Sequence, residues 1–306
     1  MNMDHAAKDG SKKSAKRPAM NRKSWLRRMD RTQLILTLLL GIFAVLMLVP
    51  IIYIINHALK PYSELFIFPP NIFVRQPTLS NFTELFVMTR DAVIPASRYL
   101  FNSIVVGVIG TGSVVIVSAI CAYPLSKHKF PGHKLLFSII VVSLMFVQEA
   151  INIPRYVVVA NLGIMNTYWA HILPHIASTV GVFLMKQFMD QVPNELIEAG
   201  KMDGAREFTI FARIIIPITL PACATVAILS FQSIWSDVST STLFMQDDAM
   251  KTFPFFLSTL TQNLANSVAR QTAAAAAALI MFLPTLIMFL FFQRKVIATM
   301  SHSGIK

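Results

Sequence analysis

Long apolar stretches alternate with short polar segments along most of the chain. Each of six stretches contains about 20 residues, which is enough for a helix to cross ~30 Å of hydrocarbon. The pattern predicts membrane-spanning helices at 34–55, 101–123, 135–153, 169–188, 214–235 and 272–292. We therefore expect an all-α integral membrane protein built as a six-helix polytopic bundle.

Polar segments divide the rest of the chain. Residues 1–33 hold ten of the 27 Lys and Arg residues and almost no large apolar side chains, which predicts a disordered basic tail. The six spans occupy 34–292. Between them we expect external loops at about 56–100, 154–168 and 236–271 and a charged cytoplasmic loop at 191–217. Residues 293–306 are expected to form a cytoplasmic tail.

The distribution of basic residues predicts the orientation. Twenty Lys and Arg residues lie on the side that contains both termini, and seven lie on the other side. Basic residues favour the cytoplasmic side, so both termini are expected there. The net charge of +12 thus reports topology, and no nucleic-acid partner is expected. With 55% apolar and 14% charged residues and a mean hydropathy of +0.59, the composition argues against a soluble enzyme.

Catalytic and metal-binding patterns are missing from the sequence. There is no Walker A motif, and no nucleophile, base and orienting group can be assembled from spacing. His171 and His175 are four residues apart, but Pro174 lies between them and no third ligand is evident, so no metal site is predicted. Glu149 is the one acidic residue within a span. It either serves the transport path or pairs with Arg155.

The segment 191–217 is the most informative part of the sequence. Its charges make it soluble, while apolar residues recur at helical spacing. Asn194 is a plausible N-cap, and Asp203-Gly204 predicts a turn between two short helices. With small residues at Ala199 and Gly200, this helical pair would fit closely into a cleft on another protein. Equally, it would lie at the membrane interface beneath its own bundle.

The same segment resembles the conserved loop of permease subunits of binding-protein-dependent ABC importers. Glu198, Ala199, Gly204, Ile214 and Pro217 fall in register with that signature. The triplet 203–205 resembles the maltose-type carbohydrate branch, as do 77–82, 162–168 and 293–306, so the likeness extends over most of 60–306. The chain departs from the family pattern at Val147, Gly200, Ile216 and Thr299.

The resemblance implies an ABC importer permease of the bacterial inner membrane that has no catalytic residue and binds no cofactor of its own. A cytoplasmic ATPase dimer would carry ATP and Mg²⁺, a second related permease would complete a heterodimer, and an extracytoplasmic protein would deliver sugar. The coupling loop that docks on the ATPase would comprise Glu195, Glu198, Ala199, Gly200, Asp203, Gly204, Ala205, Arg206, Phe208, Ile214 and Pro217. The external segment with Asp237, Asp247 and Asp248 would contact the binding protein.

Candidate substrate contacts combine aromatic faces with polar groups near the outer ends of the spans. They are Glu149, Tyr156, Trp169, Gln232, Ser233 and Trp235. An importer for another solute, such as glycerol phosphate or a polyamine, is an alternative, but an anionic substrate favours basic residues along the path and the predicted spans contain almost none. A secondary transporter is a further alternative. It would need an ion relay, which only Glu149 could start.

Overall fold

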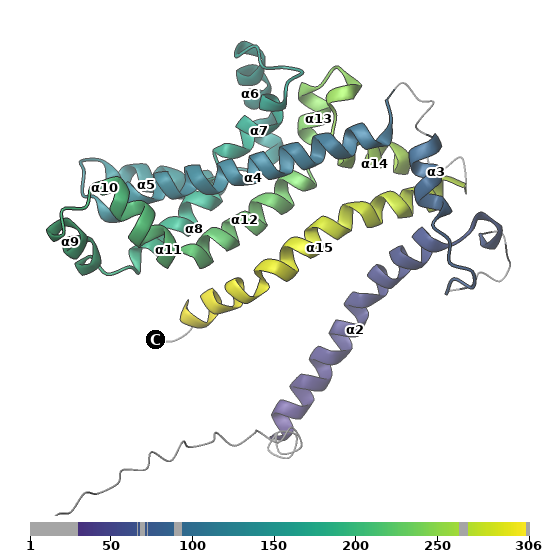
Figure 1. Ribbon diagram of the computed structural model, residues 1–306, viewed down its shortest axis with the longest axis horizontal. Coiled ribbons are helices and arrows are strands. Elements are labelled where there is room, and N and C mark those ends of the chain that lie inside the picture. Colours follow the sequence, from purple (N-terminus) through teal and green to yellow (C-terminus); the bar gives the residue numbers. More distant parts are fainter. Residues whose placement is uncertain are drawn as a thin grey trace, which may run out of the picture. The chain divides into compact units, whose positions relative to one another are not determined.

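The computed structural model describes residues 30–65, 67, 71, 73–88, 94–262 and 269–303, and these residues form helices and connecting segments without a strand. Figure 1 labels the elements. The helices are α2 (Arg31–Leu59), η2 (Tyr62–Glu64), α3 (Ser80–Met88), α4 (Ala96–Lys127), α5 (His133–Ser143), α6 (Gln148–Asn161), α7 (Tyr168–Ile176), α8 (Thr179–Asp190), α9 (Glu195–Met202), α10 (Glu207–Ile210), the π-helical turn η3 (Phe211–Ile215), α11 (Ile216–Ile218), α12 (Leu220–Trp235), α13 (Ser239–Phe244), η4 (Asp248–Met250), α14 (Phe253–Gln262) and α15 (Ala269–Ser303).

The chain divides into two units, Met1–Ile52 and Tyr53–Lys306. In the first unit the described part is most of α2, a continuous apolar helix that matches the predicted first span. Residues 1–29 of the predicted basic tail lie outside the described residues, as do 304–306 of the predicted C-terminal tail. The part of that tail up to Ser303 continues the last helix, α15.

Among the residues that the structure describes, three helices are long and apolar enough to cross a membrane unbroken, namely α2, α4 and α15 from Gln271 to Gln293. The other three predicted spans are bent pairs. The bends measure 112° between α5 and α6, 42° between α7 and α8, and 77° between α10–α11 and α12. Counting each pair as one span gives up to six, which confirms the six-helix expectation by length and composition.

The predicted spans 135–153, 169–188 and 214–235 each contain a bend, and the sequence gives reasons for these bends. Pro174 and the N-cap Ser178 interrupt the second of these runs, while Pro217 and Pro221 flank the bend in the third. In the first, polar residues from Gln148 onward replace the apolar pattern. There α6 continues to Asn161, so the first half of the predicted external loop 154–168 is helical.

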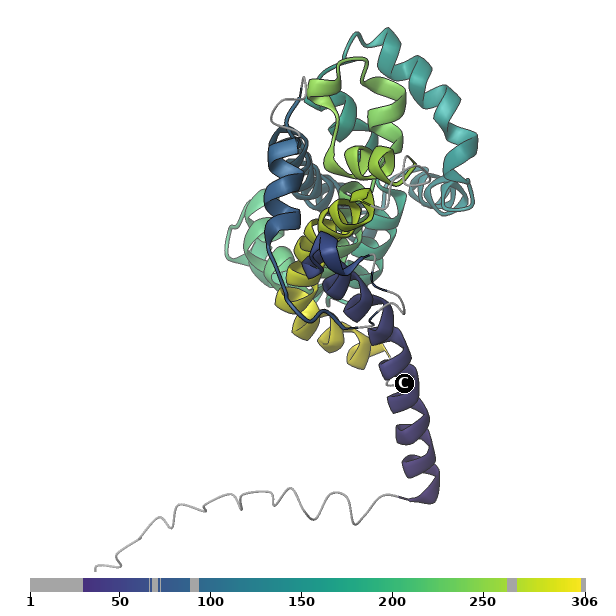
Figure 2. The same ribbon diagram turned by 90° about the vertical axis from the view of Figure 1, so that its right-hand side faces the viewer.

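Helix α4 is the central element of the second unit. It packs against α7, α8, α12 and α14, and α15 lies along the other side of α12 (Figure 1). Figure 2 shows α6 and α13 near each other at one end of this assembly, where they are in contact. Glycines allow the close approach: a Cβ on Gly107 would lie 3.4 Å from the rings of Phe231 and Trp235, and one on Gly110 would lie 3.0 Å from Ile234. Close packing through small residues is common between helices in membranes.

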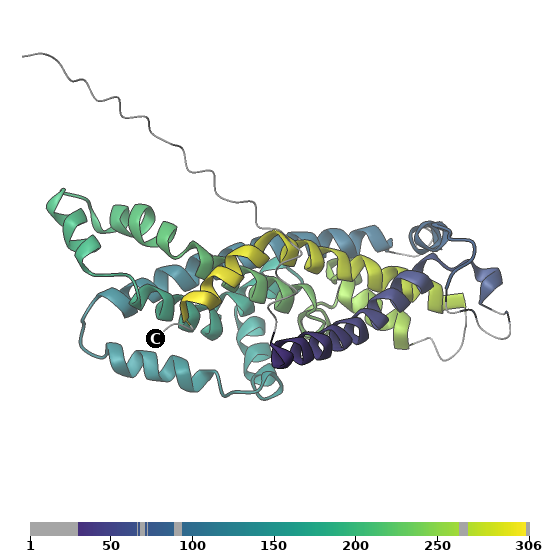
Figure 3. The same cartoon turned by 90° about the horizontal axis from the view of Figure 1, so that it is seen from below.

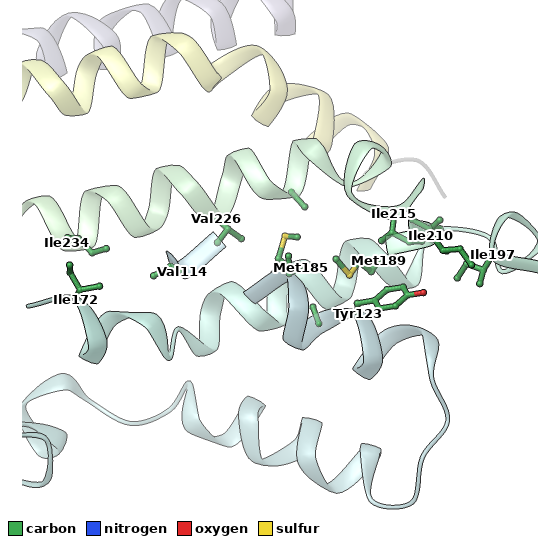
Figure 4. Close-up of a cluster of buried hydrophobic side chains, with 14 of the residues drawn as sticks. Val114, Tyr123, Ile172, Met185, Met189, Ile197, Ile210, Ile215, Val226 and Ile234 are labelled. Carbon is green, nitrogen blue, oxygen red and sulfur yellow. The ribbon is translucent and has the colours of Figure 1, made fainter. Parts of the chain in front are cut away.

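The buried apolar core runs the whole length of this bundle (Figure 4). It extends from Ile172 and Ile234 through Val114, Val226 and Met185 to Met189 and Tyr123. Beyond them it continues into the segment 191–217 through Ile197, Ile210 and Ile215. The membrane bundle and the charged loop therefore share one core.

Candidate functional site

The segment 191–217 folds as two short helices, α9 and α10, joined by a tight turn. Gly204 has a φ of +76°, which glycine adopts without the steric cost of a side chain, so the predicted turn is confirmed. Asn194 occupies the N-cap position of α9, but the prediction that its side chain caps the helix was wrong. Its Oδ1 instead accepts a hydrogen bond of 3.3 Å from Lys127 Nζ, because the end of α4 lies beside it.

One face of the loop is buried against the bundle. Ile210 and Ile215 are fully buried, and Ile197 is nearly so. Gly200 also faces inward, since a Cβ there would lie 3.0 Å from Ile214 Cδ1 and 3.3 Å from Ile210 Cγ1. At Gly200, therefore, the small surface serves packing inside the loop and not a cleft on another protein, which corrects the prediction for that residue.

The opposite face is exposed and combines apolar with charged side chains. Leu196, Met202 and Phe208 are 42%, 88% and 75% exposed. Around them lie the exposed residues Glu195, Glu198, Ala199, Asp203 and Arg206, while Ala205 and Ile214 are half-buried and Pro217 is exposed. No ion pair involves Glu195, Glu198, Asp203 or Arg206 within the described part of the chain. Figure 3 shows α9 and α10 beyond the end of α12, at the end opposite α14. We call this exposed face, with Leu196, Met202 and Phe208 at its centre, the tip surface.

Polar contacts fix the loop to the end of α4. Tyr123 Oη donates a hydrogen bond of 2.7 Å to Glu207, which also pairs with His128 at 2.9 Å and with Lys201 at 3.5 Å. Lys127 Nζ donates to the carbonyl of Val192 at 2.5 Å. Sequence reasoning missed these anchors because partners more than 60 residues apart leave no local signal.

A cavity of about 870 Å³ lies within the second unit, between the two helix breaks and the outer half of α12. Its wall contains parts of α4 and α8 and the breaks α5–α6 and α7–α8, with Gln148, Arg155, His175, Ser178, Ser233 and Asp237 among its polar groups. A cavity of this size is in the range that holds a drug-sized or saccharide ligand.

The predicted substrate contacts are only partly brought together. Ser233 lines the cavity. Trp235 is buried, stacks on Phe231 and donates its indole N–H to the carbonyl of Met281, so it serves the contact between α12 and α15. The other four candidates, Glu149, Tyr156, Trp169 and Gln232, are exposed and do not line the cavity.

Glu149 and Arg155 do not form the ion pair that was one of the two predictions for Glu149. Arg155 was expected in an external loop. Because α6 continues past Pro154, the structure places Arg155 in the cavity wall instead.

A buried polar network adjoins the cavity through His175 and Asp237. His171 is fully buried and lies 2.8 Å from Thr240 Oγ1 and 3.0 Å from the carbonyl of Met250. Thr240 Oγ1 donates to Asp237, which also bonds His175 at 3.4 Å. Both histidines are thus occupied by structural contacts, and the described residues contain no group of three or more His, Cys, Asp or Glu side chains arranged for a metal ion.

Asp237 lies just after α12 and is mostly buried. Burial raises the pKa of its carboxyl, but the hydrogen bonds from His175 and Thr240 outweigh this effect and lower the pKa to about 2. Of the three aspartates expected to contact a binding protein, Asp237 therefore belongs to the cavity wall. Asp247 caps η4 and Asp248 pairs with Lys251 at 2.5 Å, and both remain exposed.

Comparisons with known proteins agree with this architecture. The family described as "Binding-protein-dependent transport system inner membrane component" matches residues 15–300. The arabinooligosaccharides transport system permease protein AraQ of Bacillus subtilis is 29% identical, over 89% of this chain and 95% of that protein. Protein LplC of the same organism is 33% identical over 69% of this chain and 70% of that protein. The trehalose transport system permease protein SugB of Mycobacterium tuberculosis is 28% identical over 85% of this chain and 92% of that protein.

A solved structure has the same fold. In a bacterial ABC transporter that imports the acidic polysaccharide alginate, one chain superimposes with a TM-score of 0.74 at 21% identity, covering 91% of this chain and 99% of that chain. The family match spans the predicted membrane bundle and the loop 191–217 together. The chain is therefore a multi-pass membrane protein and belongs to the family of inner membrane components of binding-protein-dependent transport systems.

Proposed function

We propose that this chain is the permease subunit that forms half of a sugar or oligosaccharide translocation pathway and couples it to a separate ATPase. The relatives named above support sugar as the solute class, since their names refer to arabinooligosaccharides and trehalose. A second related permease forms the other half of the pathway, and an extracytoplasmic protein delivers the solute to the outer face. ATP and Mg²⁺ belong to the ATPase dimer, and this chain contributes no catalytic residue.

The observation that carries the proposal is the construction of the loop 191–217. Its tip surface leaves Leu196, Met202 and Phe208 uncovered among charged side chains, and such an exposed apolar patch is typical of a protein interaction site. Its inner face shares the core of the bundle through Ile210 and Ile215. A partner that binds the tip surface therefore holds a rigid extension of the membrane helices, as a coupling element requires.

Coupling then follows from these connections. When the ATPase dimer closes on ATP, it displaces the tip surfaces of the two permeases that are docked on it. In this chain the displacement passes through the π-helical turn Phe211–Ile215 into α12, and through the contact between Tyr123 and Glu207 into α4. Both helices contribute to the cavity wall. The solute path thus opens alternately to the two sides of the membrane.

The turn at Gly204 provides the sharpest test. Gly204→Val forces a β-branched residue into a positive φ, which costs at least about 1–2 kcal/mol and displaces α10 from α9. Gly132→Val is the matched control, because Gly132 also has a positive φ and open space around it but lies in the turn between α4 and α5. A second variant, Phe208→Ser, removes an exposed apolar side chain from the tip surface and leaves the fold unstrained.

The measurement is affinity purification of the tagged protein from native membranes in mild detergent, with mass spectrometry of the bound chains. We expect the wild-type protein and Gly132→Val to retain an ATPase subunit and a second permease. Gly204→Val and Phe208→Ser should keep the permease and lose most of the ATPase. Equal ATPase recovery with all four proteins, or no ATPase with the wild type, would refute the coupling role.

A further inference from the structure

Arg155 is a cation in the wall of the cavity, where the charge of Asp237 acts on it through space. Its side chain is about half buried on α6, and across the described residues it has no hydrogen bond or ion pair. A guanidinium group has five N–H donors and keeps its charge at any physiological pH. These donors have no hydrogen-bond acceptor among the described residues, so an acceptor that enters the cavity can bind them.

The acidic group in the same wall is already occupied. Asp237 accepts hydrogen bonds from the backbone N–H of Ser239 at 3.0 Å and of Thr240 at 3.2 Å, as well as those from the side chains of Thr240 and His175. It makes no ion pair with Arg155, although its charge acts on that guanidinium through space. Glu149, near Arg155 on α6, does not line the cavity.

The remaining polar lining suits a hydroxylated ligand. Ser178, Ser230 and Ser233 provide hydroxyl groups, and Gln148 provides an amide that donates and accepts. In addition, α8 begins at Thr179 in this wall, so the positive end of its helix dipole is directed toward the cavity. The lining thus combines the cation of Arg155 and the anion of Asp237 with several neutral groups that bind hydroxyls.

We propose that this cavity is a subsite for the carboxylate of an acidic saccharide, such as a uronate unit, with Arg155 as the group that binds the carboxylate. Guanidinium and carboxylate are both planar and form two parallel hydrogen bonds, which Lys cannot reproduce. The serines and Gln148 then bind the sugar hydroxyls. This inference rests on the proposed sugar-permease function and narrows its substrate to saccharides that bear a carboxylate.

The test uses the complete importer in proteoliposomes with its binding protein and ATP. Uptake of an oligogalacturonate is compared with uptake of the neutral galactose oligomer of the same length, which differs in its C6 group. The variants are Arg155→Gln, Arg155→Lys and, as a control, Arg75→Gln, because Arg75 is exposed and lies outside the cavity.

For the wild type we expect uptake of the acidic oligomer to exceed that of the neutral one. Arg155→Gln should lower acidic uptake at least about tenfold, as loss of a charge-assisted pair predicts, and leave neutral uptake within about twofold. Arg155→Lys should give an intermediate value, and Arg75→Gln the wild-type value.

Two results would overturn the proposal. Equal losses for the two oligomers in Arg155→Gln, or uptake of the neutral oligomer alone by the wild type, would remove the carboxylate subsite and leave the sugar-permease function standing. If an importer that hydrolyses ATP takes up neither oligomer but does take up glycerol phosphate or a polyamine, the sugar function itself fails, and this inference fails with it.

Discussion

Asp237 illustrates how a single residue in the cavity wall is held by its hydrogen bonds. Its lowered pKa means that the folded protein holds the ionised carboxylate more tightly than the unfolded chain does. The stabilisation is complete above the unfolded pKa, near pH 4, and is lost as the pH falls through the folded value of about 2. At pH 7 the charge is therefore a fixed part of the structure.

We expect Asp237→Asn to lower the free energy of unfolding by about 2 kcal/mol at pH 7, in line with a pKa shift of nearly two units. The difference between variant and wild type should stay constant from pH 5 to 8 and shrink below pH 4. Thermal unfolding of the detergent-solubilised protein across this range measures it. A variant as stable as the wild type at pH 7 would show that the network contributes nothing to the fold.

Local patterns predicted some site residues and not others. The Asp203-Gly204 turn and the two short helices follow from turn and helix chemistry within a few residues. By contrast, the anchor at Glu207 depends on Tyr123, 84 positions away, and the exposure of Met202 depends on which face of α9 meets the bundle. Arg155 was placed in a loop because the apolar pattern ends before it, although α6 does not.

At the scale of secondary-structure elements, the close approach of α4 and α8 depends on a glycine. A Cβ on Gly181 would lie 2.4 Å from Ser118 Oγ and 3.2 Å from Ser118 Cβ. The first distance is too short for two non-bonded atoms, so one of the two helices or the serine side chain would have to shift. The two helices form one of the principal contacts of the bundle. Gly181 therefore sets the spacing between the central helix and the helix that begins at the cavity.

Gly181→Ala should separate α8 from α4 and destabilise the protein by about 1–3 kcal/mol, as overpacking usually does. Ser118→Gly removes two of the three close atoms, including the closest, and leaves Ser178 Oγ at 3.1 Å, so the double variant should recover much of the loss. Gly112→Ala, also on α4 but with nothing within 4 Å of its Cβ, is the control and should be neutral or slightly stabilising. Melting temperatures of the four purified proteins decide between these outcomes.

The lengths of the apolar runs predicted the spans well, because a helix that crosses the membrane needs a minimum number of apolar residues. The bends were harder to predict. Proline marks the breaks in 169–188 and 214–235, but a proline inside a helix, such as Pro124 in α4, does not always break it. Whether it does depends on neighbouring helices, which a single sequence does not specify.

At the scale of the whole molecule, the bundle and the loop behave as one body because they share a core and a polar anchor. Tyr123 belongs to both, since its ring packs against Phe211 and its hydroxyl bonds Glu207. Losing the hydroxyl alone leaves the packing intact and loosens the connection between α4 and the loop.

We therefore expect Tyr123→Phe to assemble normally with its ATPase but to move less solute for each ATP hydrolysed. The relevant measurement is the ratio of solute uptake to phosphate release in proteoliposomes. Tyr53→Phe, which changes an exposed tyrosine on α2, is the control. An unchanged ratio in Tyr123→Phe would mean that the core alone transmits the motion.

The continuity of the loop with α12 also sets a mechanical scale. Helix α12 has 16 residues and, at 1.5 Å per residue, is about 24 Å long. It begins beside the loop and ends at the cavity, and thus acts as a lever arm. A tilt of about 10° about its inner end would move its outer end by about 4 Å, close to the width of a sugar ring. A small rotation at the tip surface therefore produces a displacement at the outer end of α12 that is large enough to change access to the cavity.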